Sequence, residues 1–452
     1  MTPVSEAKPA SKAAALRTSL PEGTIQVASA LVIAGIATYV FFKVGTWAVG
    51  DTTVERKENF KPLSSLWFAT FALAPGFFLP LEQELGRALG HRRAIGEGGR
   101  PVVAKVARLG LILGGVVALV IIVISPIITS SYFDDNWVLV AALVVAFVCY
   151  APAHIARGIC SGTGRFKPYA IVMGTDGVVR LVACLILAVI GVQAVGAYAF
   201  VVALSPMVGI TYVFSRGQLK TQPGPEASWS EVTPNLGWLL LGSIFAAGLL
   251  NAGPVLTTLL AAEHQKSEVT EFSYGVLLAR VPLFMFQAVQ AALLPRLSRL
   301  AAAGNFEEFR SGLKRLLMLV VAVGVVGSLG ALAIGPFILE KVYDAKLSGV
   351  TLALLAAGSA CYMLALALSQ AIIALKGHSL VARGWVCGAV ALALGTWLSS
   401  DDVFRRVEIG VLLSSIAAMA FFAVALRFRL ASGARPDEQS IVEAFTDSPV
   451  EP

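Results

Sequence analysis

The sequence predicts an all-α integral membrane protein with about twelve transmembrane helices in two six-helix lobes. The first observation behind this prediction is composition: of 452 residues, 57% are hydrophobic and only 14% are charged. A soluble protein of this size does not need so much apolar surface. In a membrane protein the net charge of +7 reports topology rather than nucleic-acid binding. We therefore expect membrane lipid, and no nucleic acid, around the chain.

The second observation is the number of apolar runs that are long enough to cross a bilayer. Six precede residue 215: Ile25–Val49, Pro62–Leu81, Leu109–Thr129, Trp137–Ile155, Tyr169–Ile190 and Val195–Phe214. Six follow a polar linker at 215–235: Leu236–Leu260, Phe272–Leu294, Leu316–Leu339, Val350–Leu375, Val381–Leu398 and Ile409–Leu426. This division predicts lobes at 25–214 and 236–430. The polar segments 1–24 and 431–452 are expected to be cytoplasmic tails, the second one disordered.

The third observation is the distribution of basic residues. With the N-terminus placed inside, inside segments hold 24 of the 35 Lys and Arg residues and outside segments hold 9. The other two, Arg180 and Arg280, lie within spans. Because cytoplasmic loops are enriched in Lys and Arg, this bias predicts a multi-pass protein of the inner (cytoplasmic) membrane with both termini in the cytoplasm.

The two halves of the chain resemble each other. Pro75 in APGFFLPLEQELGRALG matches Pro282 in VPLFMFQAVQAALLPRLSRL, 207 residues later. Gly164 in SGTGRFKPYAIVMG matches Gly377 in IALKGHSLVARG, 213 residues later. Six helices per half is an even number, so both halves have the same orientation. They are expected to be related by a pseudo-two-fold axis along the membrane normal, with a site at their interface.

The motifs of several enzyme classes are missing from the sequence. There is no G-x-x-x-x-G-K-[ST] phosphate loop, and the four histidines form no catalytic or metal-binding set. The five cysteines lie in or beside apolar spans and match no zinc pattern. We expect no enzyme activity, no cofactor and no metal.

Arg280 is the strongest candidate for a functional residue. Helical periodicity places Arg280, Gln287 and Gln290 on one side of the span, and Pro282 predicts a bend there. An arginine at this depth costs at least ~2.5–3.5 kcal/mol to insert, so it should face protein or water. It can bind an anionic headgroup; alternatively, it pairs with an acid or reaches the membrane surface. The two glutamines can bind sugar hydroxyls or hydrogen-bond other helices.

Three further polar residues lie within predicted spans. Asp176 and Arg180 are four residues apart and can meet on one helix face. They either form a self-neutralising ion pair, or Arg180 binds an anion while Asp176 couples an ion such as a proton. Asn251 precedes Gly253-Pro254, which predicts either a broken-helix binding site or a packed kink.

A cluster of charges follows the second span. Glu82 and Glu84 can form a cytoplasmic gate with Arg87 or Arg296. A solvated helix end is the alternative that we favour for these residues.

Two motifs give the chain a family resemblance. GRFKPY after the fourth span and ARVPLFMFQAVQAALLPRLSRLAAAGNFEEF around the eighth resemble the multidrug/oligosaccharidyl-lipid/polysaccharide (MOP) superfamily. The resemblance covers roughly residues 25–430 and is greatest to the polysaccharide-export, Wzx-type flippase branch. Peptidoglycan-precursor flippases of the superfamily usually have fourteen helices and charges in the first, whereas the first span here carries only Lys43. That departure disfavours the peptidoglycan branch.

The resemblance implies a function and a mechanism. It implies two lobes around a cationic cavity, where Arg280 and Arg180 fit by position. It also implies alternating access and transfer of a polyprenyl-pyrophosphate-linked oligosaccharide from the inner to the outer leaflet, for cell-surface polysaccharide biosynthesis. A glycan polymerase or glycosyltransferases are the implied partners.

Three alternatives to a flippase stay open at the level of sequence. A cation-coupled multidrug exporter of the same superfamily would favour acidic residues in its cavity, and only Asp176 supports it. A membrane glycosyltransferase would need a catalytic acid or base and usually a sizeable outer loop, and the sequence shows neither. A non-transporting assembly partner is the third.

Overall fold

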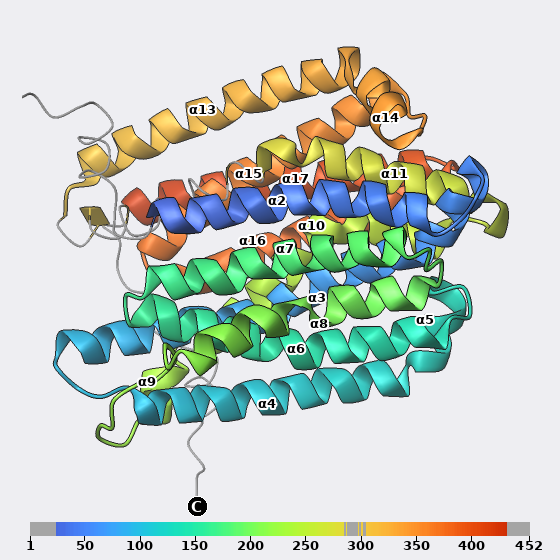
Figure 1. Cartoon of the computed structure of the whole chain (residues 1–452). Coiled ribbons are helices and arrows are strands. Elements are labelled where there is room, and N and C mark those ends of the chain that lie inside the picture. The colour runs from blue at the N-terminus through green and yellow to red at the C-terminus, as the bar shows by residue number, and fades with distance from the viewer. Residues whose placement is uncertain (1–23, 284–285, 287–296, 298–299, 302–303, 432–452) are drawn as a thin grey trace, which may run out of the picture.

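The computed structural model describes residues 24–431 apart from 284–285, 287–296, 298–299 and 302–303. Its described residues form helices and connecting loops without strands. The long helices run side by side in one bundle (Figure 1). Eleven described helices are long and apolar enough to cross a membrane. The expected span Phe272–Leu294 falls partly outside the described residues.

The first lobe consists of seven helices, of which the short α5 continues α4. Their bounds are α2 Thr24–Ala48, α3 Thr53–Ala94, α4 Arg100–Val123, α5 Ser125–Tyr132, α6 Trp137–Gly162, α7 Phe166–Val189 and α8 Val195–Ser215. Helix α2 packs on α7, α3 packs on α6, and α8 packs on both α6 and α7.

The second lobe follows the linker and its short helix α9, Trp229–Val232. Its bounds are α10 Leu236–Leu260, η1 Glu263–Gln265, α11 Lys266–Ala279, α13 Phe306–Ala333, α14 Gly335–Tyr343, α15 Gly349–Ala374, α16 His378–Leu398 and α17 Val403–Ala431. Helix α17 packs on α15 and α16, while α13 packs on α15. The two-lobed, all-helical fold is confirmed, and the residue boundaries of the lobes stay a prediction.

Several helices differ from the expected apolar runs. Helix α10 has the predicted bounds, but α3 is 42 residues long because it continues on both sides of its apolar run. Thr52 and Glu55 form a capping box at its start. Apolar length measures depth in hydrocarbon rather than the length of the helix. The third and ninth runs are each broken in two, just before Pro126 and Pro336. Each of these prolines lies in the first turn of the second piece, where its missing N–H costs no helical hydrogen bond.

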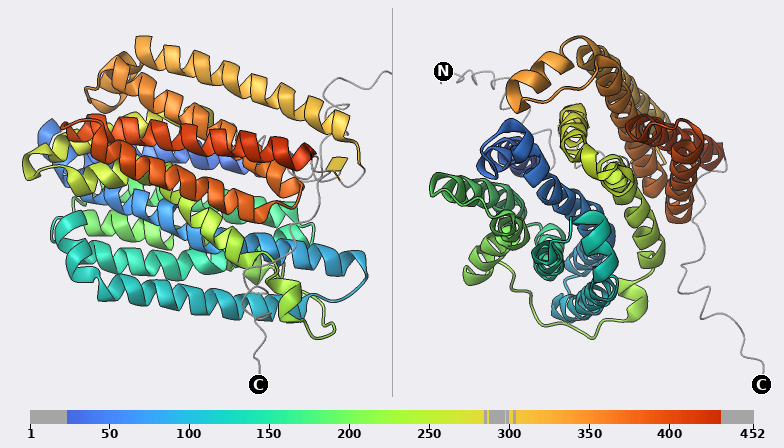
Figure 2. Two further views of the ribbon diagram at one scale, coloured as in Figure 1. Left: turned by 180° about the vertical axis from the view of Figure 1, so that it is seen from behind. Right: turned by 90° about the vertical axis from the view of Figure 1, so that its right-hand side faces the viewer.

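The lobes meet along α3 and α10. The elements coloured blue to green lie on one side of the end-on view in Figure 2, and those coloured yellow to red lie on the other. The approach is close: a Cβ added to Gly76 would lie 3.1 Å from the Cα of Ile244. Nearby, Ser243 Oγ donates to the carbonyl oxygen of Pro75 at 3.1 Å. Of the two ends of the bundle, we call the one with residues 49–52 the α2–α3 end and the other the linker end.

The linker is bound to the first lobe. Arg92 of α3 is 3% exposed and donates to both carboxylate oxygens of Glu231, at 2.6 and 2.9 Å. It also donates to the carbonyl oxygens of Gly98 and Pro225 at 3.0 and 2.7 Å. The predicted polar loop therefore has a fixed path over the first lobe as far as α9.

Candidate functional site

The candidate site is centred on aromatic residues in the middle of α3. Trp67, Phe68 and Phe71 lie on one turn, and Phe68 is 1% exposed. The rings of Trp67 and Phe71 have centroids 4.6 Å apart. Because α3 lies at the interface of the lobes, these rings can contact groups from both.

Arg280 approaches this aromatic segment from the second lobe. It caps α11 two residues before Pro282, at the place where the sequence predicted a bend. The side chain is 8% exposed. Its Nη1 donates to Oδ1 of Asn251 at 3.1 Å, and its Nη2 donates to the carbonyl oxygen of Leu250. Its guanidinium carbon lies 5.6 Å from the centroid of the Phe68 ring.

The charge of Arg280 has no anionic partner among the described residues. Its hydrogen-bond acceptors are an amide and a carbonyl, both neutral. An aromatic face attracts a guanidinium but does not cancel its charge. The described contacts therefore do not show the predicted alternative in which Arg280 pairs with an acid. The site contains a buried positive charge.

Arg180 approaches α3 from within the first lobe. The predicted pair with Asp176 is confirmed, with 2.5 Å between Nη2 and Oδ2. The guanidinium carbon of Arg180 is 4.4 Å from the Trp67 ring and 5.2 Å from the Phe71 ring. Asp176 also accepts a hydrogen bond from Ser205 at 2.5 Å. This cluster is neutral as an ion pair.

The structure thus brings three of the predicted site residues to one aromatic segment. The guanidinium groups of Arg180 and Arg280 both lie over rings of α3, and Arg280 and Asn251 come from the other lobe. Asn251 donates to the Phe71 carbonyl oxygen at 3.2 Å and so links Arg280 to α3. Helix α10 is continuous through Pro254, so the broken-helix alternative is wrong. With Asp176 counted against Arg180, the net charge of the segment is that of Arg280.

A small cavity lies on the second-lobe side of Arg280. Its polar lining comes from Arg280, Ser359, Tyr362 and Ser415. Its volume of about 20 Å³ has room for about one water molecule. A sugar or a pyrophosphate does not fit there, so access to Arg280 requires the helices around it to move.

The solvated-end interpretation of Glu82 and Glu84 is wrong. These side chains are 6% and 3% exposed, because α3 continues to Ala94 and packs against α6. Glu82 binds His154 Nδ1 at 2.9 Å and accepts from Arg157 Nε at 3.0 Å.

The described partners of these two carboxylates all lie in the first lobe. Tyr169 donates to Glu82 at 2.9 Å, and Arg87 donates to Glu84 at 2.8 Å. Arg87 in turn donates to the Glu231 carbonyl oxygen in α9 at 2.6 Å. Arg296, the other predicted partner of the gate, lies outside the described part of the chain. Gln287 and Gln290 lie outside it as well.

The sequence interpretation missed the aromatic partners. Trp67, Phe68, Phe71 and Tyr150 are ordinary residues of apolar runs, and nothing in the composition distinguishes them. The available signal was spacing: Trp67 and Phe71 are four residues apart and share one face of a helix. Only the structure shows that the guanidinium groups of Arg180 in α7 and Arg280 at the end of α11 lie over these rings.

Comparison with known proteins supports the membrane-transporter interpretation. A family model described as the lipid II flippase MurJ matches residues 178–375, which include Arg180 and Arg280. An uncharacterized protein of Mycobacterium tuberculosis is 27% identical over 381 residues, covering 80% of this chain and 83% of its own length. A second uncharacterized protein of that organism is 26% identical over 338 residues, covering 71% of this chain and 74% of its own.

Solved structures with the same fold include MATE transporters. An inward-facing multidrug resistance MATE family transporter of the MOP superfamily has a TM-score of 0.67 at 14% identity, covering 90% of this chain and 98% of that one. An outward-facing one has a TM-score of 0.64 at 14% identity, covering 94% and 99%. The Vibrio cholerae MATE transporter VcmN in the bent form has a TM-score of 0.63 at 14% identity, covering 92% and 98%.

The comparisons agree on the superfamily and differ from the expected branch. The matched family model is that of a lipid II flippase, whereas the first span was taken to favour polysaccharide export. Residues 178–375 exclude α2, on which that argument depended. The match therefore does not decide between the two branches of the superfamily. The predicted resemblance is confirmed: this membrane protein has the transporter fold of the MOP superfamily, and part of its chain matches that superfamily's lipid II flippase family.

Proposed function

We propose that the protein is a flippase for a polyprenyl-pyrophosphate-linked oligosaccharide. It moves the headgroup from the inner to the outer leaflet by alternating access of its two lobes, and it serves the biosynthesis of a cell-surface glycan. In this proposal the linker end is cytoplasmic. Proteins that polymerise or assemble the glycan are its proposed partners.

The observation that carries the proposal is the buried charge of Arg280 at the interface of the lobes. A pyrophosphate headgroup must cross about 30 Å of hydrocarbon, where it loses its hydration. A guanidinium replaces part of that hydration with directed, charge-assisted hydrogen bonds. The present acceptors of Arg280 are neutral, so an anionic headgroup competes with them better than it would with a carboxylate.

One further observation supports a lipid-linked anion. The match to a lipid II flippase family includes both deep arginines, which agrees with a lipid-borne substrate. Arg180 is already neutralised by Asp176, so it is proposed as a secondary contact. Gln287 and Gln290 are proposed to bind sugar hydroxyls.

A multidrug exporter is the second candidate, because solved structures with this fold include multidrug resistance MATE family transporters. An exporter of cationic drugs needs a negative site, with Asp176 as its candidate ion-coupling residue. The positive charge of Arg280 and the pairing of Asp176 disfavour it. An assembly partner without transport activity is the third.

The test is transport by the purified protein in proteoliposomes without ATP. One set of liposomes carries a polyprenyl-pyrophosphate oligosaccharide, and a second set carries a lipophilic cation. We expect translocation of the pyrophosphate headgroup and no movement of the cation. Movement of the cation alone would contradict the flippase and support the exporter.

A further inference from the structure

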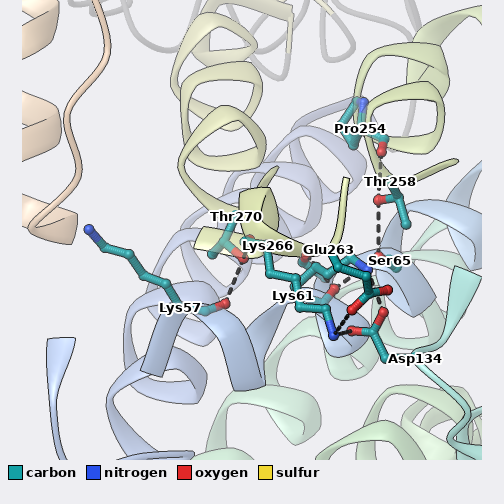
Figure 3. Close-up of polar contacts among 10 residues, drawn as sticks. Lys57, Lys61, Ser65, Asp134, Pro254, Thr258, Glu263, Lys266 and Thr270 are labelled. Carbon is teal, nitrogen blue, oxygen red and sulfur yellow. Dashed lines mark hydrogen bonds and ion pairs between the residues drawn. The ribbon is translucent and has the colours of Figure 1, made fainter. Parts of the chain in front are cut away.

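Cross-lobe polar contacts join the two lobes at the α2–α3 end. Lys57, Lys61 and Ser65 of α3 and Asp134 of the α5–α6 loop belong to the first lobe. Their counterparts in the second lobe are Thr258, Glu263, Lys266, Thr270 and Glu271. We call these nine residues the outer gate; Figure 3 shows eight of them, with Ser65 next to Thr258 and Lys61 next to Asp134.

The hydroxyl contacts of the outer gate have alternatives within their own lobes. Ser65 and Thr258 meet across the interface at 3.1 Å between their hydroxyl oxygens. Ser65 also donates to the Lys61 carbonyl oxygen at 2.9 Å, and Thr258 donates to that of Pro254 at 2.9 Å. Separation of the lobes would leave both hydroxyls with acceptors already in place.

The contacts of Lys266 and Thr270 follow the same rule. Lys266 lies 3.7 Å from the Asp134 carboxylate across the interface, but 2.7 Å from that of Glu263 in its own lobe. Thr270 donates across the interface to the Lys57 carbonyl oxygen at 2.7 Å and within α11 to that of Lys266 at 3.4 Å. Asp134 keeps Lys61 of its own lobe, at 2.5 Å.

Lys57 is the exception among the charged residues of the outer gate. Its Nζ lies 2.6 Å from Glu271 Oε1 and donates to the Asp344 carbonyl oxygen at 2.6 Å, and both partners belong to the second lobe. Among the described residues no acceptor of the first lobe contacts this ammonium group. Lys57 is only 6% exposed. Glu271 would keep the backbone N–H of Lys346, 3.0 Å away.

Other cross-lobe contacts near the gate are of types that contribute less than a buried ion pair such as Lys57–Glu271. Lys43 pairs with Asp344 at 3.3 Å, but these side chains are 44% and 67% exposed, and exposed ion pairs contribute little. Tyr39 donates to the Leu277 carbonyl oxygen at 2.8 Å, a neutral hydrogen bond. Charge-assisted hydrogen bonds are roughly twice as strong as neutral ones. The Lys57–Glu271 pair is thus the strongest contact that separation would break without replacing it inside either lobe.

We propose that the outer gate opens during transport and that the Lys57–Glu271 pair sets the balance between its closed and open states. The proposal rests on the proposed alternating access. When the gate is closed, the two charges neutralise each other away from water. When it opens, Lys57 can exchange its partners only for water, whereas the other charged and hydroxyl groups of the gate can also turn to their own lobes.

The test is a distance measurement between the lobes. Spin labels at Ile190→Cys and Ser399→Cys, in a chain whose five native cysteines are replaced by alanine, report the separation at the α2–α3 end. Removing one partner of a buried pair leaves the other charge uncompensated. We therefore expect Lys57→Gln to raise the ratio of open to closed protein about tenfold or more.

Lys61→Gln is the matched control. Lys61 is equally buried on α3, one turn away, and its ion pair is with Asp134 of its own lobe. We expect it to keep the parent distribution of distances. The same opening in Lys61→Gln, or a parent-like distribution in Lys57→Gln, would overturn the proposal.

Two further variants make the result independent of the folding of Lys57→Gln. Glu271→Gln removes the same ion pair from the other side and should open the gate as well. The exchange Lys57→Glu with Glu271→Lys should restore the closed distribution. If Glu271→Gln folds as a monodisperse protein and stays closed, the pair does not set the balance.

The distances need no substrate, so they are independent of the transport assay. If Lys57→Gln opens the gate but the parent protein moves no lipid-linked anion, the proposed function is contradicted and the proposal about the outer gate stands. Translocation by the parent, together with closed Lys57→Gln and Glu271→Gln variants, would contradict the gate alone.

Discussion

At the scale of single residues, the two deep arginines have different electrostatic surroundings. Arg180 forms an ion pair, whereas Arg280 has neutral acceptors and an aromatic face among its described contacts. The sequence offered an ion pair with Asp176 for Arg180 and left open whether Arg280 pairs with an acid. Only the structure shows that one charge is compensated and the other is not.

Arg280→Ala should weaken the binding of a pyrophosphate-linked lipid. A hydrogen bond to a charged group contributes about 1.5–3 kcal/mol, so the dissociation constant should rise about 10- to 150-fold. Arg280→Lys keeps the charge but not the guanidinium fork, so its dissociation constant should lie between those of the parent and of Arg280→Ala. The increase in melting temperature of the purified protein on addition of the lipid measures the effect. An equal increase for all three proteins would show that Arg280 does not contact the headgroup.

Asp176→Asn should destabilise the fold. It leaves the buried guanidinium of Arg180 without its counter-ion, and breaking a buried pair in this way costs about 3–5 kcal/mol. Asp176→Asn combined with Arg180→Met removes the orphaned charge and should recover most of the loss. Unfolding in detergent measures each variant. A double variant no more stable than Asp176→Asn would mean that the loss does not come from the uncompensated charge.

At the scale of elements, the linker is fixed to the first lobe by several donors, among which Arg92 is the buried one that binds a linker carboxylate. Arg92 binds the Glu231 carboxylate and two backbone carbonyl oxygens of residues 98 and 225. Movement between the lobes is therefore expected to begin after α9, at the short connection to α10. The polar, proline-containing sequence predicted a linker but not this attachment, which depends on how α3 projects beyond its apolar run.

Arg92→Gln should release the linker without unfolding the helices. Without the guanidinium, the Glu231 carboxylate and the carbonyl oxygens of the linker lose their shared donor. Limited proteolysis should then cut within residues 216–228 faster than in the parent. The neighbouring variant Arg93→Gln is the control, because Arg93 is exposed and donates to the Thr163 carbonyl oxygen instead. Equal rates in both variants would show that Arg92 does not hold the linker.

At the scale of the whole molecule, much of the architecture follows from the sequence. Apolar runs predicted about twelve membrane-spanning helices, because the bilayer fixes the length of a spanning helix. Eleven described helices are long and apolar enough to cross a membrane, and the expected span Phe272–Leu294 lies partly outside the described residues. The apolar runs did not predict the true ends of α3 or the breaks at Pro126 and Pro336, which depend on capping and on proline. Nor did they predict that Glu82 and Glu84 are buried, because a carboxylate after an apolar run resembles a solvated end unless its partners, His154 and Arg157, are known.

The candidate site was predictable only in part. A charge within an apolar run is visible in any sequence, and Arg280, Arg180 and Asp176 were found in this way. That α3 supplies Trp67, Phe68 and Phe71 to both arginines depends on helix packing, which the local sequence does not encode. The substrate class depends on net charge at the interface, and that required the ion pairs of the structure.

The measurement that tests the central claim most directly is headgroup translocation by the parent protein and by two arginine variants. Each is reconstituted in equal amounts into proteoliposomes that contain a polyprenyl-pyrophosphate oligosaccharide, without ATP. We predict that the parent moves the headgroup across the bilayer and that Arg280→Ala reduces the rate to that of protein-free liposomes. Arg310→Ala, which removes an exposed arginine from α13, should keep the parent rate. Translocation by Arg280→Ala at the parent rate would contradict the claim that the buried charge at the lobe interface carries the anionic headgroup.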